Sequence, residues 1–145
     1  MKKRVVVTGV GVVSPIGMNA ADLWTSLLAG KSGTGLITRF DTEHFSSKVA
    51  AEVKDFDPSP WLDKKEQRRM DLSEQYAVVA SELALDDAGL NKSAVDPDRA
   101  GVIIGSGIGG IATFERQHSL LENSGPGRVS PFLIPMMIID MCAGL

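Results

Sequence analysis

The sequence contains only one cysteine, Cys142, so no disulfide can form within the chain. A lone thiol suits a reducing compartment, and we expect a cytoplasmic protein. Its two histidines, His44 and His118, fall in an expected loop and on a polar helix face, at a spacing that suits neither a metal site nor a cysteine–histidine pair. We therefore expect no metal and no cofactor.

Long apolar runs and an excess of positive charge are also missing. No span of 18 apolar residues occurs, so no membrane helix is expected. The net charge of −3 argues against a nucleic-acid binder. Met1–Arg4 and the apolar Val5–Val13 imitate a secretory signal, but Thr8, two glycines and Pro15 interrupt the stretch and no convincing cleavage site follows. The segment is interpreted as a first buried strand.

The length of 145 residues and the hydrophobic content of 43% indicate one α/β domain. The most informative part of this chain is the stretch Arg99–Gly110. Its apolar, β-branched run Ala100–Ile104 breaks into a glycine-rich loop, which predicts a buried strand ending in a turn. Ile111–Leu121 is predicted to be a helix. This order places Ser106–Gly110 at the carboxyl end of a strand, where open α/β sheets bind their ligands.

Two interpretations of this loop differ in function. Gly105, Gly107 and Gly110 match the G-x-G-x-x-G pattern of dinucleotide sites, but such sites need an acidic residue after a second strand, and Glu122 still lies on the predicted helix. Alternatively, the glycines let Ile108 and the backbone approach another element closely. The second interpretation is favoured.

Composition and periodicity predict the remaining elements in chain order. They are a strand over Arg4–Val10, a helix begun by Asn19 and stopped by Gly30, a loop over Lys31–Phe45, a strand within Phe45–Phe56, a short helix over Trp61–Met70, a helix begun by Asp71 and Glu74 and ended by Gly89, an extended segment over Pro131–Pro135 and an apolar helix over Met136–Met141. Because the last helix is apolar nearly all round, we expect the chain to be part of a larger domain or to need a partner to cover it.

No self-contained catalytic set is visible. Cys142 lies late in the apolar helix, without the positive neighbour or helix N-terminus that a reactive thiolate needs. Ser106 lies between two glycines, but the spacing is not that of a G-x-S-x-G nucleophile elbow. We expect neither residue to be a nucleophile.

One basic cluster stands out in this acidic chain. It comprises Lys64, Lys65, Arg68 and Arg69. Spacings of three and four residues place Lys65, Arg68 and Arg69 on one helical face. The face is interpreted either as a positive docking patch or as an ordinary solvated surface.

Five segments together resemble the N-terminal part of the β-ketoacyl-acyl carrier protein synthases, the type II condensing enzymes of fatty-acid synthesis. They are RVVVTGVGVVSPIG, NAADLWTSLLAGKSG, KKEQRRMD, GSGIGG and SPFLIPMMIIDMCAG. The resemblance covers all 145 residues in order. It implies a thiolase-like αβαβα layered sandwich, of which residues 1–145 form an incomplete N-terminal half, and a homodimer that condenses an enzyme-bound acyl group with malonyl-acyl carrier protein.

The resemblance also implies where the catalytic groups lie. The family's nucleophilic cysteine, at a helix N-terminus, and its two histidines are expected beyond residue 145. Cys142 does not replace that nucleophile, because it falls in the preceding helix. This chain is therefore expected to contain no catalytic residue and to be inactive alone. A non-catalytic module that dimerises or docks acyl carrier protein is the alternative.

Binding roles are implied for residues within the chain. Lys65, Arg68 and Arg69 resemble the family's docking patch for the acidic acyl carrier protein. Ile108 resembles the residue that gates the acyl pocket. The segment with Leu133 and Ile134 resembles the one that crosses the dimer and lines the partner's pocket.

Overall fold

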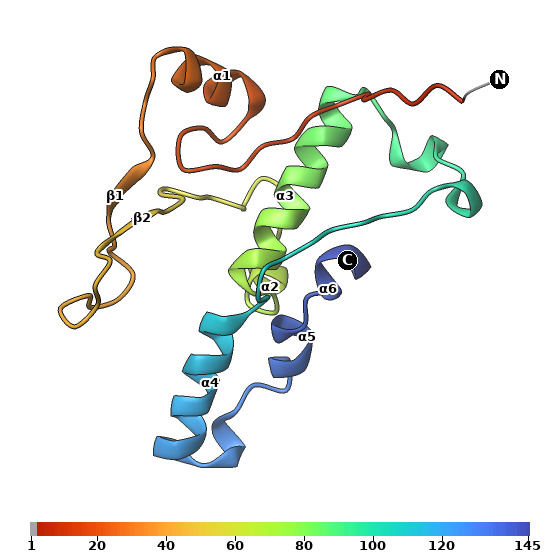
Figure 1. The fold of residues 1–145 in the computed structure, drawn as a ribbon. Coiled ribbons are helices and arrows are strands. Elements are labelled where there is room, and N and C mark those ends of the chain that lie inside the picture. The colour runs from red at the N-terminus through yellow and green to blue at the C-terminus, as the bar shows by residue number, and fades with distance from the viewer. Residues whose placement is uncertain (1–2) are drawn as a thin grey trace. The chain divides into compact units, whose positions relative to one another are not determined.

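The computed structural model describes residues 3–145, and the chain divides into two compact units (Figure 1). The first comprises Met1–Asp57 and Glu82–Leu90, and the second comprises Pro58–Ser81 and Asn91–Leu145. The long helix α3, Leu72–Asp87, contributes residues to both units.

Helix α1 of the first unit, Ala20–Leu28, begins and ends where the sequence predicts. The Asn19 side-chain oxygen accepts a hydrogen bond from the Asp22 backbone N–H at 2.8 Å, which satisfies one of the free donors of the first turn. Gly30 follows the helix with a φ of +64°, a conformation that favours glycine. These short-range interactions explain why the prediction is confirmed.

Strands β1, Thr34–Leu36, and β2, Val49–Ala51, form a two-stranded antiparallel sheet in which Gly35 lies opposite Ala50 (Figure 1). The β2 strand is the core of the strand predicted within Phe45–Phe56. The prediction of an uninterrupted loop over Lys31–Phe45 is wrong, because β1 lies inside it. Strand pairing across the sequence, rather than local periodicity, gives β1 its conformation.

The predicted strand over Arg4–Val10 is extended but pairs with no other strand among the described residues, so that prediction is wrong. Instead, the Val10 backbone N–H donates to the Asp87 carboxylate at 2.8 Å. Gly9 lies so close to α3 that a β-carbon there would come within 2.2 Å of the Ala84 carbonyl oxygen. This contact with a helix anchors the end of the segment.

The second unit is mainly helical. Besides its share of α3, it contains α2 (Lys64–Gln67), α4 (Ile111–Ser124), α5 (Leu133–Met137), α6 (Met141–Gly144) and the short 3-10 helices η1 (Lys92–Ala94), η2 (Pro97–Arg99) and η3 (Pro126–Arg128). The helix predicted over Trp61–Met70 is shorter than expected, whereas α3 and α4 confirm the predicted helices begun by Asp71 and Ile111.

The predicted central strand over Ala100–Ile104 is wrong in this structure. The segment is extended, but it pairs with no strand among the described residues, and Ile103 is 99% exposed. A buried strand needs neighbours that accept and donate its backbone hydrogen bonds. Without such neighbours, an apolar β-branched run predicts only an extended backbone.

The C-terminal region also departs from the prediction. The expected extended segment Pro131–Pro135 and helix Met136–Met141 are both wrong, because α5 begins at Leu133 and ends at Met137. Pro135 is tolerated in the first turn of a helix, where its missing N–H costs no helical hydrogen bond. Ile138 then adopts an extended conformation and separates α5 from α6.

A small core lies in the second unit. Its buried apolar side chains are Leu62, Val79, Met136 and Cys142, and its buried polar side chains are Asp71, Glu74, Thr113 and Gln117. Helix α5 packs beside α4 (Figure 1). Across residues 3–145, no helix combines the length and the apolar character needed to cross a membrane.

Candidate functional site

The glycine loop before α4 makes a close backbone contact with α5. The Gly110 N–H donates to the Met137 carbonyl oxygen at 3.1 Å, and a β-carbon on Gly110 would lie 2.0 Å from the Met136 carbonyl oxygen. Gly109 has a φ of +77°. The predicted close approach of backbones is therefore confirmed at these two glycines. Glu122 lies on α4, so it does not supply the acidic residue of a dinucleotide site.

Ile108 lies in this loop with 68% of its surface exposed. The loop is held on one side by the Ser106 hydroxyl, which accepts the Gly109 N–H at 3.1 Å. A bulky apolar side chain is thus presented between two glycines, of which Gly107 has open space around its α-carbon. The geometry leaves room for the side chain to move.

The basic cluster is presented by α2 and the turn after it. The Asp63 carboxylate accepts the backbone N–H groups of Glu66 and Lys65, which lowers its pKa, and the nearby Lys65 and Arg69 charges lower it further. Lys65, Arg68 and Arg69 are all exposed. The structure therefore presents the three predicted docking residues to solvent.

Arg68 and Arg69 differ in their surroundings. The Arg69 guanidinium carbon lies 4.5 Å from the centroid of the Phe132 ring, a cation–π arrangement. No hydrogen bond or ion pair holds the Arg68 guanidinium among residues 3–145. Arg69 therefore also packs against Phe132, whereas the hydrogen-bond donors of Arg68 remain available to a partner.

Beside Arg68 lies a cavity of about 390 Å³ that the sequence did not reveal. Arg68, Asp71, Thr113 and Arg116 line it together with apolar side chains. The Thr113 hydroxyl donates to Asp71 Oδ2 at 2.6 Å, and an Arg116 N–H donates to the Thr113 oxygen at 3.3 Å. These bonds join Asp71, the residue before α3, to α4, and no sequence spacing predicts them.

Two buried titratable groups, Glu74 and Cys142, interact electrostatically in the second unit. Glu74 is 2% exposed, and burial, aided by the nearby Asp71 charge, raises its pKa to about 7, although the Asp71 N–H opposes the shift. Its Oε1 has no hydrogen-bond partner. Burial and then the Glu74 charge raise the pKa of the Cys142 thiol, while a Ser73 hydrogen bond lowers it. The thiol is therefore protonated at neutral pH, which favours the prediction that it is not a nucleophile.

Leu133 and Ile134 lie in the first turn of α5 rather than in an extended segment. Ile134 is 57% exposed, whereas Leu133 is half-buried. Ile134 therefore exposes more apolar surface than Leu133 does.

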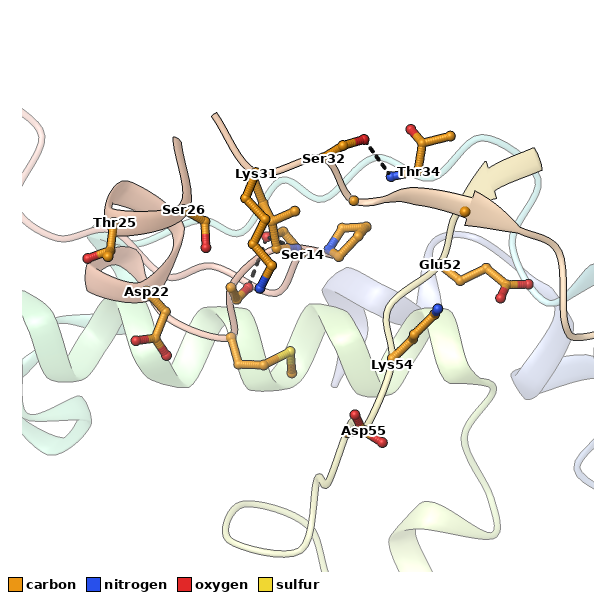
Figure 2. A pocket seen from close by; sticks show the side chains of 16 residues that line it. Ser14, Asp22, Thr25, Ser26, Lys31, Ser32, Thr34, Glu52, Lys54 and Asp55 are labelled. Carbon is orange, nitrogen blue, oxygen red and sulfur yellow. Dashed lines mark hydrogen bonds between the residues drawn. The ribbon is translucent and has the colours of Figure 1, made fainter. Parts of the chain in front are cut away.

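A larger hollow of about 610 Å³ lies in the first unit, between α1, β1 and the segment after β2 (Figure 2). Two lysines, Lys31 and Lys54, and three carboxylates, Asp22, Glu52 and Asp55, line it. None of the predicted site residues does so. Among the described residues, no group of three or more histidines, cysteines or carboxylates could hold a metal ion.

Comparison with known proteins identifies the class to which this arrangement belongs. The family described as "Beta-ketoacyl synthase, N-terminal domain" matches residues 2–145, and the chain belongs to this family. Among solved structures, the ishigamide ketosynthase/chain length factor superposes with a TM-score of 0.81 and 35% identity, over 92% of this chain and 33% of that one. The predicted fold class, the α/β N-terminal portion of a thiolase-like ketosynthase, is confirmed.

Curated relatives are more similar in sequence. The chain is 49% identical to 3-oxoacyl-(acyl-carrier-protein) synthase 2 of Coxiella burnetii over 144 residues, which cover 99% of this chain and 35% of the relative. It is 51% identical to the synthase of the same name from Staphylococcus aureus over 142 residues, which cover 98% of this chain and 34% of the relative. The chain thus spans about a third of the length of these relatives.

Proposed function

We propose that this chain is the N-terminal part of a cytoplasmic 3-oxoacyl-acyl carrier protein synthase, which condenses an enzyme-bound acyl group with malonyl-acyl carrier protein in fatty-acid elongation. The observation that carries the proposal is the identity of about half of all residues to two synthases of that name, over nearly the whole chain. The complete enzyme is a homodimer and an acyltransferase.

The chain's part in this reaction is binding, not bond formation. Nucleophilic catalysis needs an activated nucleophile and a base. Cys142 is 5% exposed and its raised pKa keeps the thiol protonated. The resemblance to the condensing enzymes implies that the nucleophilic cysteine and the two histidines belong to the part of the synthase outside these 145 residues, and we expect the chain alone to be inactive.

Docking of the acidic carrier protein is assigned to Lys65, Arg68 and Arg69. All three are exposed, and they lie on or directly after one short helix. Rim charges of this kind steer association over distances comparable to the Debye length, about 10 Å at 0.1 M salt. Their contribution is to the rate of encounter and to the affinity at low ionic strength.

Binding of the acyl chain is assigned to Ile108, Leu133 and Ile134. Ile108 gates the acyl pocket, and its exposed side chain between glycines suits a part that moves aside. Leu133 and Ile134 present apolar surface from α5 to the partner subunit's pocket. Their exposure differs, so Ile134 is assigned the larger contact.

The test of activity uses the complete gene product that contains residues 1–145, supplied with an acyl carrier and a malonyl carrier. We expect a 3-oxoacyl product and released carbon dioxide, with the Cys142→Ala variant as active as the parent. Absence of any product, with carrier binding retained, would instead support the non-catalytic docking module. Turnover that disappears in Cys142→Ala would refute the assignment of the nucleophile.

The test of docking reverses the charge of Arg68 in the same protein. Arg68→Glu is preferred to an Arg69 variant, because Arg69 also packs on Phe132. We expect weaker carrier binding at low salt and little difference at high salt. Arg99→Glu, an exposed reversal on η2, is the matched control and should bind normally. Equal affinities of the two variants at low salt would make the cluster an ordinary solvated surface.

A further inference from the structure

The cavity beside α2 brings together two arginines that are distant in the sequence. Arg68 follows α2, whereas Arg116 lies in the middle of α4, and both line the same space of about 390 Å³. The side chains of Met70, Leu72 and Met136 supply apolar lining. Such a site offers cationic groups from two directions above an apolar surface.

The charges around this cavity do not cancel. Asp71 is its only carboxylate, and both Asp71 oxygens are engaged: Oδ1 accepts the Ser73 N–H and hydroxyl, each at 2.9 Å, and Oδ2 accepts the Thr113 hydroxyl at 2.6 Å. The aspartate is also 8% exposed. It is therefore committed to the protein, and the two arginines leave one positive charge in excess.

Arg116 is oriented by this same set of bonds. One of its N–H groups donates to the Thr113 oxygen at 3.3 Å, and no other hydrogen bond or ion pair of its guanidinium occurs within residues 3–145. A guanidinium has five N–H donors in a planar fork. Most donors of Arg116, like those of Arg68, are thus available to a carboxylate.

We propose that Arg116 completes the docking site, so that one acidic side chain of the acyl carrier protein enters this cavity and is held between Arg68 and Arg116. The proposal rests on the proposed function, which supplies an acidic partner protein. A carboxylate on a short aliphatic stem fits the lining, because its methylene groups contact the methionines while its oxygens accept from both guanidinium groups.

The test is a double-mutant cycle on the complete gene product, with acyl carrier protein binding measured at low ionic strength. Arg68→Glu and Arg116→Glu should each weaken binding about three- to tenfold, as is usual for charge pairs near a surface. If both arginines hold one carboxylate, the double variant should lose less than the product of the two single losses, because the second reversal acts on a contact already lost. Arg99→Glu again serves as the control.

The outcomes separate this inference from the proposed function. Loss of binding in Arg68→Glu with normal binding in Arg116→Glu would overturn the role of Arg116 and leave the docking patch in place. Independent, multiplicative losses would overturn the shared carboxylate. Normal binding in both variants would refute docking at this surface altogether.

A matched pair of variants controls for folding. Thr113→Val removes the bond that orients Arg116 but keeps its charge, whereas Arg116→Lys keeps the charge but loses the planar fork. If Arg116 binds the carrier, Arg116→Lys should retain more affinity than Arg116→Glu at an equal melting temperature. Equal losses of carrier affinity in Arg116→Lys and Arg116→Glu would show that the loss of affinity is structural and does not depend on the charge of residue 116.

Discussion

The buried carboxyl of Glu74 makes the stability of this protein depend on pH, and its neutral isostere Glu74→Gln should remove that dependence. Glu74 is 2% exposed, its Oε1 has no hydrogen-bond partner, and Asp71 and the Cys142 thiol lie nearby. Burial raises the pKa of Glu74 to about 7 from its ordinary value of 4.5. The folded protein therefore holds a proton there that the unfolded chain releases more readily.

The sign and the size follow from this shift in pKa. Because the pKa of Glu74 is higher in the folded protein than in the unfolded chain, the contribution of Glu74 to the free energy of unfolding is complete below pH 4.5 and is lost as the pH rises through about 7. One pKa unit corresponds to about 1.4 kcal/mol, so the loss is at most about 3 kcal/mol. Glutamine carries no charge at any of these pH values and avoids this cost.

The assay is chemical denaturation of the complete gene product at a series of pH values from about 4.5 to about 8. The parent protein should become less stable across this range, whereas Glu74→Gln should change less and should exceed the parent in stability at the alkaline end. Glu115→Gln neutralises an exposed carboxylate on α4 and should follow the parent. An unchanged pH profile in Glu74→Gln would refute the reasoning, since the dependence would then come from other groups.

Three further outcomes are expected. Gly110→Ala should lower the free energy of unfolding by about 1–3 kcal/mol in thermal or chemical unfolding, because its β-carbon would lie 2.0 Å from the Met136 carbonyl oxygen. Gly107→Ala is the control and should lower it much less, because there is open space around that position. Equal losses of stability in the two variants would contradict the close approach. Ile108→Phe in the complete synthase should slow condensation of long acyl primers about tenfold to a hundredfold and spare short ones, and a loss that is uniform over primer length would exclude a gate. Cys142, buried and with a raised pKa, should react with a thiol reagent far more slowly in the native than in the unfolded protein, and rapid native labelling would disprove its burial.

The helix starts were within reach of the sequence because their causes are local. Asn19 accepts the Asp22 backbone N–H three residues away, and Glu74 accepts the Asp71 N–H, as its position in the predicted capping box requires. The Asp63 cap of α2 was missed, because the predicted helix began at Trp61. The prediction that Lys65, Arg68 and Arg69 share one helical face is wrong, because α2 ends at Gln67 and both arginines follow it, although all three residues are exposed. The family was predicted from the order of five segments, and the comparisons confirm it.

The wrong predictions concern elements whose partners are remote. The apolar run Ala100–Ile104 was predicted to be a strand, but strand formation needs a neighbouring backbone, and none of the described strands pairs with it. For the same reason β1 was missed, since its conformation depends on pairing with β2. Pro135 was predicted to end an extended segment, although it lies inside α5.

The sequence by itself determined helices α1, α3 and α4, the N-caps of α1 and α3 and the family, because each depends on residues within a few positions of one another or on the order of motifs. Only the tertiary structure placed Glu74 beside Cys142, and Arg116 across a cavity from Arg68. The members of each pair belong to different parts of the chain, and side-chain periodicity predicts which face of a helix a residue occupies but not what packs against that face. The groups with the most unusual chemistry in this chain are therefore the ones that local patterns could not predict.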